Sequence, residues 1–247
     1  MSGKRDGYRS RLTALTDWEP FLLEESGLPG PRANLELAQA VAEEGTQEHF
    51  MRWISIGPDA ASSNSPGVFL VVCGTIGLGR LIAGGQIGLL PILRRCASDP
   101  RWRVREGVAM ALQRWGDKDM DALLAEMNAW SQGNLLEQRA AAAALCEPRL
   151  LGHAGHAHAV LQLLDSITTC IQQVSQRKDD DFKVLRQGLA YCWSVAVAAL
   201  PAKGKAYMEK WFASNDRDII WIMKQNLQKN RLARMDPEWV ERWLAQR

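Results

Sequence analysis

The sequence predicts an all-α fold, and two observations lead to this prediction. Apolar residues recur three and four positions apart along most of the chain, which is the period of a helix with one buried side. Alternation of apolar and polar residues with period two is absent, as are turn dipeptides between β-branched runs. We therefore expect short helices joined by short polar turns.

The expected helices follow from where the apolar period begins and ends. Residues 1–32 are expected to be irregular or partly helical, with one helix around Arg9 to Leu15. Segments 27–34 and 57–67 are rich in Gly, Pro, Ser and Asn, so both are expected to be loops. Helices are expected over 33–44, 46–55, 66–83, 87–97, 100–115, 119–132, 134–146, 156–177, 181–199, 203–213, 217–229 and 236–246.

Local signals refine two of these helices. Asp99 and Pro100 are residue types that favour an N-cap and a first helical position, and Gly116 suits a left-handed residue after the last turn. Asp236 and Pro237 repeat the start signal near the end of the chain. Between the first pair of signals runs an apolar stripe formed by Val104, Val108, Ala111, Leu112 and Trp115.

Composition narrows the class of protein. The chain has 247 residues, 47% of them hydrophobic, and a net charge of +2, which is typical of a soluble globular protein. A role in nucleic-acid binding would therefore need local basic patches. The N-terminus lacks an apolar secretory segment, and glycines with Arg80 interrupt the longest apolar run, so we expect no membrane span and a cytoplasmic location. Five cysteines without CxxC spacing are expected to be reduced and buried.

A motif recurs along the expected helices. Val104-Arg105 is followed by apolar residues three and seven positions after the arginine and by a small residue four positions after it. Arg139 and Arg186 begin similar runs, and Ile220 begins a weaker one with Lys224 at the small position. Helix pairs that repeat in this way bury their apolar faces by stacking on neighbouring pairs.

The stretch "DPRWRVREGVAMAL" resembles HEAT repeats, with the armadillo family as a neighbour. HEAT repeats carry an Asp in the turn between two helices and a Val-Arg pair on the second. Asp99 and Asp180 stand six residues before Arg105 and Arg186, whereas Gly133 and Ser214 depart from the pattern. The resemblance implies a single right-handed α-α superhelix over 1–247 of about five to six helix pairs. Residues 33–86 would form degenerate repeats and 87–247 HEAT-like repeats.

The resemblance also implies that the second helix of each pair lines a concave face. The arginines of this face offer two interpretations: they bind phosphate or an acidic peptide, or they pair with aspartates and tie repeats together. The second is favoured for Arg105, Arg139 and Arg186. The cluster of Arg94, Arg95, Arg101 and Arg103 lacks obvious acidic partners and is the better anion candidate, although a solvated face is the simpler interpretation. The candidate binding residues are Arg101, Trp102, Arg103, Arg105, Glu106, Arg139, Arg186, Trp221 and Lys224.

Other motifs carry weaker hypotheses. Trp102 and Trp221 fall outside the apolar stripes, so they could stack a base or hold a peptide, or Trp102 could pack on a neighbouring unit. The segment "GHAGHAH" holds His153, His156 and His158, but no carboxylate lies between them, and we expect no metal and no cofactor. The glycines of 73–88 follow no strand, so we interpret them as a small face for close helix contact rather than a dinucleotide site.

These observations favour a non-enzymatic binding scaffold whose concave face holds a protein segment or another extended, acidic partner. The alternative is a relative of the HEAT-like DNA glycosylases of alkylation repair, which bind duplex DNA and use aromatic residues and a carboxylate. Glu106 is the only inner-helix carboxylate in the best-matched repeat, and it can pair with Arg101 or Arg103. No catalytic residue is assigned, and a prosthetic-group lyase has no support beyond the fold. The oligomeric state is not readable from the sequence.

Overall fold

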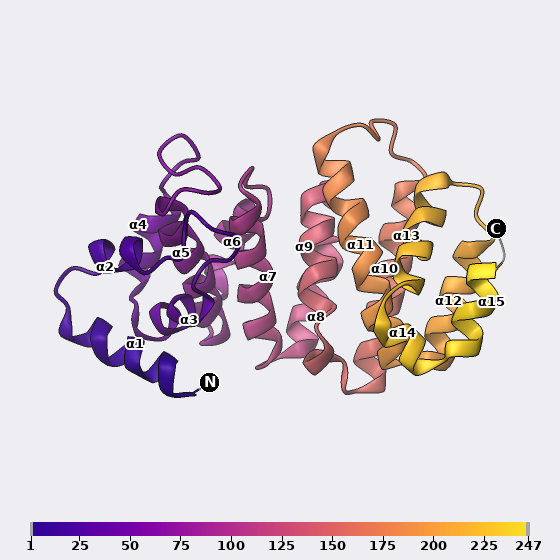
Figure 1. Cartoon of the computed structure of the whole chain (residues 1–247), viewed down its shortest axis with the longest axis horizontal. Coiled ribbons are helices and arrows are strands. Elements are labelled where there is room, and N and C mark those ends of the chain that lie inside the picture. The colour runs from indigo at the N-terminus through magenta and orange to yellow at the C-terminus, as the bar shows by residue number, and fades with distance from the viewer. Residues whose placement is uncertain (1, 246–247) are drawn as a thin grey trace. The chain divides into compact units, whose positions relative to one another are not determined.

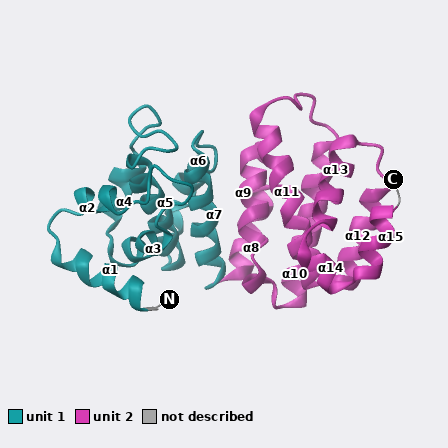
Figure 2. Cartoon of the chain, viewed as in Figure 1, with its two compact units in different colours: residues 1–118 teal, residues 119–247 magenta. Residues whose placement is uncertain are grey.

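The computed structural model describes residues 2–245, and within these residues every regular element is a helix (Figure 1). The all-α prediction is therefore confirmed. The chain divides into two compact units, Met1–Lys118 and Asp119–Arg247 (Figure 2), which are described separately below. Among the described residues, no helix has the length and apolar character needed to cross a membrane.

Unit 1 is built around one central helix, α5 (Gly67–Ala83), which packs against α3, α4 and α7. α1 packs on α3, and α6 packs on α7. Almost all of α5 is buried, which explains why its sequence is apolar on every side. The other helices of unit 1 are α1 (Ser2–Ala14), α2 (Glu19–Glu24), α3 (Leu35–Glu44), α4 (Gln47–Ile54), the 3₁₀ turn η1 (Ile87–Leu89), α6 (Leu90–Ala97) and α7 (Trp102–Gly116).

Glycines let the neighbours of α5 approach it closely. A Cβ on Gly77 would overlap the ring of Phe50 on α4, and a Cβ on Gly79 would overlap the backbone of Ala111 on α7. Gly74 likewise faces α4, where a Cβ would lie 2.9 Å from the carbonyl oxygen of Phe50. The interpretation of these glycines as a surface for close helix contact is confirmed, with the contact directed to two different helices.

Unit 2 consists of two series of packed helices, with α8, α10 and α12 in one series and α9, α11 and α13 in the other. α10 packs on α8 and α12, whereas α11 packs on α9 and α13 and also contacts α10 and α12. The side chains of Trp130 and Trp193 are fully buried in this unit. The helices are α8 (Met120–Trp130), α9 (Leu135–Leu145), the 3₁₀ turn η2 (Pro148–Leu151), α10 (Ala154–Ile171), α11 (Asp180–Ala199), α12 (Pro201–Phe212), α13 (Arg217–Leu227), α14 (Asn230–Met235) and α15 (Pro237–Ala245).

Each of the twelve expected helices has a counterpart, and most bounds agree within about three residues. The prediction missed α2 and α14, which have six residues each and are too short to show a period. It also extended α10 to 177. The helix ends at Ile171 because Arg177 folds back and donates to the carbonyls of Ile171 and Val174.

The helix signals had mixed outcomes. Asp119 and Asp236 accept main-chain N–H groups in the first turns of α8 and α15, as their residue types predict. Asp99, however, precedes α7 by three positions, because its carboxylate accepts the N–H of Arg101 and pairs with that residue's guanidinium. Gly116 stays helical, and in the described residues only Gly27 and Gly85 have positive φ angles.

Replacing Gly79 tests the close approach of α5 and α7. Gly79→Ala places a Cβ against the backbone of Ala111, so we expect a loss of about 1–2 kcal/mol in unfolding free energy despite the higher helix propensity of alanine. Urea unfolding followed by circular dichroism measures this change. Gly88→Ala is the matched control, because a Cβ there meets no atom within 4 Å. A Gly79→Ala midpoint equal to or above the wild-type value would contradict the packing argument.

Candidate functional site

Arg101, at the start of α7, is buried and fully engaged, with 4% of its surface exposed. Its Nε and Nη2 contact the two carboxylate oxygens of Asp99 at 2.9 and 2.7 Å. Its Nη1 donates to the main-chain carbonyls of Ile56 and Ala61 at 2.9 and 3.2 Å. Arg101 therefore fixes the loop between α4 and α5, and the expectation that it lacks an acidic partner is wrong.

Arg103 and Arg105 also donate to main-chain carbonyls of irregular segments. The Nε of Arg103 donates to the carbonyl of Ser63 at 2.8 Å, and its Nη2 donates to the carbonyl of Gly30 at 2.7 Å. The Nη1 of Arg105 donates to the carbonyls of Asp99 and Pro100 at 2.6 and 3.0 Å. Irregular loops leave carbonyls without helical donors, and a guanidinium offers five N–H groups to satisfy them. The carboxylate of Asp99 pairs with Arg101, so the expected pair between Asp99 and Arg105 involves only the main chain of Asp99.

Trp102 and Glu106, the other two candidates on this turn, line a groove in unit 1. The groove lies between α7 and residues 31–35, with α5 beneath it, and has a cavity of about 380 Å³. We call it the Trp102 groove, and its lining includes Arg32, Leu35, Val72, Trp102, Glu106 and Met110.

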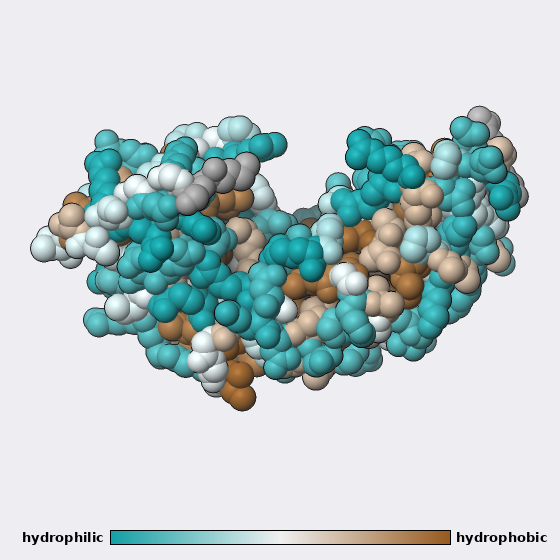
Figure 3. All heavy atoms as spheres, turned by 90° about the horizontal axis from the view of Figure 1, so that it is seen from below, coloured by the Kyte–Doolittle hydropathy of each residue, from teal (hydrophilic) through white to brown (hydrophobic). Residues whose placement is uncertain are grey.

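The aromatic wall of the Trp102 groove is open to solvent. Trp102 is 45% exposed, and the guanidinium of Arg103 lies 4.2 Å from the centroid of its ring. Trp115, on the apolar stripe of the same helix, is 7% exposed, as predicted. Most of the surface visible in Figure 3 is hydrophilic, with separate hydrophobic patches. In the described chain, the large hydrophobic residues that are exposed are Leu35, Ile87, Trp102, Tyr191 and Leu244.

In unit 2, the remaining four candidates lie on α9, α11 and α13. Arg139 on α9 packs its stem against α11, where a Cβ on Gly188 would lie 3.2 Å from the arginine Cγ. Arg186 on α11 lies over the ring of Trp221 on α13, 4.2 Å from its centroid. Lys224 follows Trp221 by one turn and is exposed. Arg217, which was not predicted from the sequence, precedes Trp221 by one turn and is also exposed. We call the surface formed by Arg139, Arg186, Arg217, Trp221 and Lys224 the Trp221 face.

An ion-pair network supports one edge of the Trp221 face. Arg177 contacts Asp216 at 2.6 Å and Asp218 at 3.0 Å, and Asp218 also contacts Arg186. The repeat pattern predicted that Arg186 would match Asp180, but Asp180 pairs with Lys183 at 2.7 Å. Asp218, in the first turn of α13, therefore takes the place that the repeat pattern gives to Asp180.

Two cations of the Trp221 face stay outside this network. Within residues 2–245, neither Arg217 nor Lys224 forms an ion pair. Both side chains project from the exposed side of α13, at positions four before and three after Trp221. The face therefore has a surplus of positive charge around a half-buried indole.

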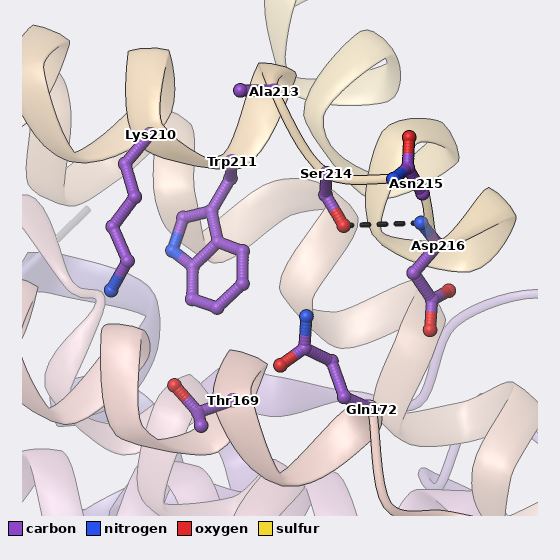
Figure 4. A pocket seen from close by; sticks show the side chains of 8 residues that line it. All are labelled: Thr169, Gln172, Lys210, Trp211, Ala213, Ser214, Asn215 and Asp216. Atoms are coloured by element: carbon purple, nitrogen blue, oxygen red, sulfur yellow. Dashed lines mark hydrogen bonds between the residues drawn. The ribbon is translucent and has the colours of Figure 1, made fainter.

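A further cavity of about 520 Å³ lies in unit 2 where α10 and α12 end (Figure 4). Several of its polar groups already have partners within the chain. Lys210 and Trp211 both donate to the carboxylate of Asp165, and the Ser214 hydroxyl accepts the N–H of Asp216. The side chain of Gln172 points toward the loop that carries Ser214 (Figure 4). No sequence motif indicated this cavity.

The histidines of "GHAGHAH" have separate partners. His156 contacts Asp121 at 3.0 Å, whereas His158 contacts Lys203 at 3.2 Å. In the part of the chain that the structure describes, no group of three or more His, Cys, Asp and Glu residues could hold a metal ion. The ammonium of Lys203 beside His158 also opposes a cation at that ring.

The five cysteines are free thiols, and none of them is exposed. Burial raises the pKa of Cys96 to about 11 and raises the pKa values of Cys73 and Cys146 well above the usual value for a thiol. These three thiols stay protonated near neutral pH, so they are poor nucleophiles. Their predicted role as buried, reduced side chains is consistent with this environment.

Removing the Arg101 guanidinium tests its structural role. Arg101→Met removes the guanidinium donors of the Asp99 carboxylate and of two loop carbonyls, so we expect a loss of about 3 kcal/mol in unfolding free energy. Limited proteolysis should also cut the 57–66 loop faster. Arg32→Met, at an exposed position, should change stability by less than about 0.5 kcal/mol. Equal stability and equal cleavage for Arg101→Met and wild type would refute the role.

The Arg177 network predicts a pH dependence. Hydrogen bonds from Arg177 hold the pKa of Asp216 below its usual value, so this stabilisation is present above about pH 4 and is lost as pH falls through the folded-state pKa. The difference in unfolding free energy between wild type and Arg177→Met should therefore be largest above pH 4 and shrink toward pH 2. Lys224→Met, without an acidic partner, should show a difference that does not vary with pH. A constant difference for Arg177→Met would contradict the pKa assignment.

Comparison of the chain with protein-family models, with curated proteins and with solved structures finds no match.

Proposed function

We propose that this chain is a non-enzymatic binding protein of HEAT-like helix pairs, and that the Trp221 face of unit 2 holds an acidic segment of a partner protein. The observation that carries the proposal is the pair of exposed cations, Arg217 and Lys224, on either side of an indole that is itself stacked under Arg186. Carboxylates of a partner would meet these cations while an apolar stem contacts Trp221.

The packing of unit 2 supports the HEAT-like interpretation. α8 and α9, α10 and α11, and α12 and α13 are consecutive helices, and the second members contact one another in the order α9, α11, α13. In stacked helix pairs, the second helices share one side and can present a continuous surface to an extended partner. The Trp221 face lies on these second helices, where the repeat motif places its arginines.

Duplex DNA is the second candidate partner. Two stacked pairs in unit 2 favour it: Arg186 over Trp221 and Arg231 over Tyr191, at 4.2 and 4.8 Å from the ring centroids. Nucleic-acid surfaces combine such aromatic groups with cations. Against this candidate, Arg101, Arg103 and Arg105 donate to loop carbonyls, which removes three of the cations that a phosphate backbone would need.

A glycosylase activity has weaker support than binding. Such chemistry needs a carboxylate that is available beside an exposed aromatic residue, and the only matching pair among the candidates is Glu106 with Trp102. Glu106 already interacts with another group of the chain. The proposal therefore assigns no catalytic residue.

Charge reversal on α13 tests the acidic partner. A fluorescein-labelled decaglutamate peptide should bind the wild-type chain at low salt, and Arg217→Glu with Lys224→Glu should weaken that binding about tenfold or more. Fluorescence anisotropy measures the dissociation constant, which should rise with salt concentration. Lys118→Glu, at an exposed lysine of unit 1, is a control for charge reversal outside unit 2.

The same assay separates the two candidate partners. Absence of peptide binding at low salt would overturn the proposal. Tighter binding of a duplex DNA of equal charge, together with a steep salt dependence and loss of binding in Trp221→Ala, would favour the nucleic-acid candidate instead.

A further inference from the structure

We infer that the Trp102 groove of unit 1 is a second binding site, and that it takes a bulky aliphatic side chain from an acidic protein segment. The inference rests on the proposed function in one respect, namely that the partner is a protein. The residues that form the site belong to the other unit, so the two sites can be tested independently.

The groove concentrates exposed apolar surface. Leu35 and Trp102 are 48% and 45% exposed, and both line this one cavity although they stand far apart in the sequence. Val72 and Met110 continue the apolar lining beneath and beside them. Isolated exposed apolar residues are ordinary, whereas several that converge on one concave surface mark a place where a partner contacts the protein.

The walls of the groove are held in place before any partner arrives. The guanidinium of Arg103 stacks on Trp102 and donates to the carbonyls of Gly30 and Ser63, which connects α7 to both neighbouring loops. Gly107 lets α7 lie against α5, where a Cβ would stand 3.3 Å from Thr75. When the walls of a site are already ordered, little binding free energy is lost in ordering them.

The volume of the groove indicates the size of its occupant. A cavity of about 380 Å³ lies near the lower end of the range for small-ligand sites, about 300–1,000 Å³. The two exposed walls, Leu35 and Trp102, show that it is open on one side. A leucine-sized side chain that projects from a longer segment fits an open site of this kind, with the segment itself running along the rim.

Charged residues at the rim of the groove indicate which residues of the partner segment lie next to its aliphatic side chain. The lining includes two cations, Arg32 and Arg103, and one carboxylate, Glu106. Arg32 is exposed, so it can meet a carboxylate of the partner. Arg103 keeps its charge although its N–H groups donate to loop carbonyls, so the formal charge of the lining is positive, which favours acidic residues beside the aliphatic anchor over basic ones.

Three peptides test this chemistry directly. They are fluorescein-labelled and share the frame Gly-Ser-X-Z-X-Ser-Gly, with Asp-Leu-Asp, Asp-Ser-Asp or Lys-Leu-Lys at the centre. For the wild-type chain, we expect the Asp-Leu-Asp peptide to bind about tenfold more tightly than the Asp-Ser-Asp peptide, because only leucine removes apolar surface from water. We also expect it to bind more tightly than the Lys-Leu-Lys peptide.

Variants locate the binding in the groove. Leu35→Ser changes an exposed residue and should abolish the preference for leucine over serine, as should Trp102→Ala. Ile87→Ser, at an exposed apolar residue of the same unit that does not line the groove, should keep the preference and is the matched control. Arg32→Glu should reverse the preference between the acidic and basic leucine peptides. Circular dichroism of each variant checks that it is folded.

The outcomes separate this inference from the proposed function. Arg217→Glu with Lys224→Glu should weaken binding of decaglutamate and leave the leucine preference unchanged. If decaglutamate binds at the Trp221 face but leucine and serine peptides bind equally, the inference is overturned and the proposed function stands. A Lys-Leu-Lys peptide that binds more tightly than Asp-Leu-Asp overturns the inference, and so does a leucine preference that survives both Leu35→Ser and Trp102→Ala.

Discussion

Unit 1 depends on the donation of guanidinium N–H groups to the carbonyls of its irregular loops. Arg101 and Arg103 reach the loop between α4 and α5, and Arg103 also reaches the loop before α3. Without these donors, the loop carbonyls would be buried or part-buried and unsatisfied, which is costly. The same hydrogen bonds fix where α7 begins, because Asp99 is held by Arg101 and the first helical turn follows that pair.

This use of the arginines decides where ligands can bind in unit 1. A guanidinium that donates to two carbonyls at once has little left to offer an anion, so Arg101, Arg103 and Arg105 are poorly placed to bind one. The residues between these arginines are affected differently. Trp102 and Glu106, one helical turn apart, line a groove whose walls Arg103 holds in place. A basic stretch therefore supports an apolar site.

Much of the fold could be predicted from the sequence, whereas the candidate sites could be predicted only in part. Helical periods are local, so twelve of the longer helices were found, α1 was found in part, and the six-residue helices α2 and α14 were missed. Buried tryptophans could also be predicted, because Trp115 and Trp193 lie on the apolar stripes of their helices and both are buried. The distant partners of Arg101 and Arg186 could not be predicted. Ile56, Ala61 and Asp218 lie 32 or more residues away from them, and no local pattern indicates such contacts.

The two candidate surfaces differ in the partners of their arginines, and this difference follows from the elements that lie beside each arginine. Arg186 stands beside a helix start whose aspartate can pair with it, so its charge is shared rather than removed, and the face around it keeps Arg217 and Lys224 exposed. Arg103 lies beside loops, so its N–H groups donate to loop carbonyls, and the ring of the neighbouring Trp102 stays exposed. An arginine near the start of a helix can thus share its charge with an aspartate or donate its N–H groups to carbonyls, depending on whether its neighbour in space is a helix or a loop.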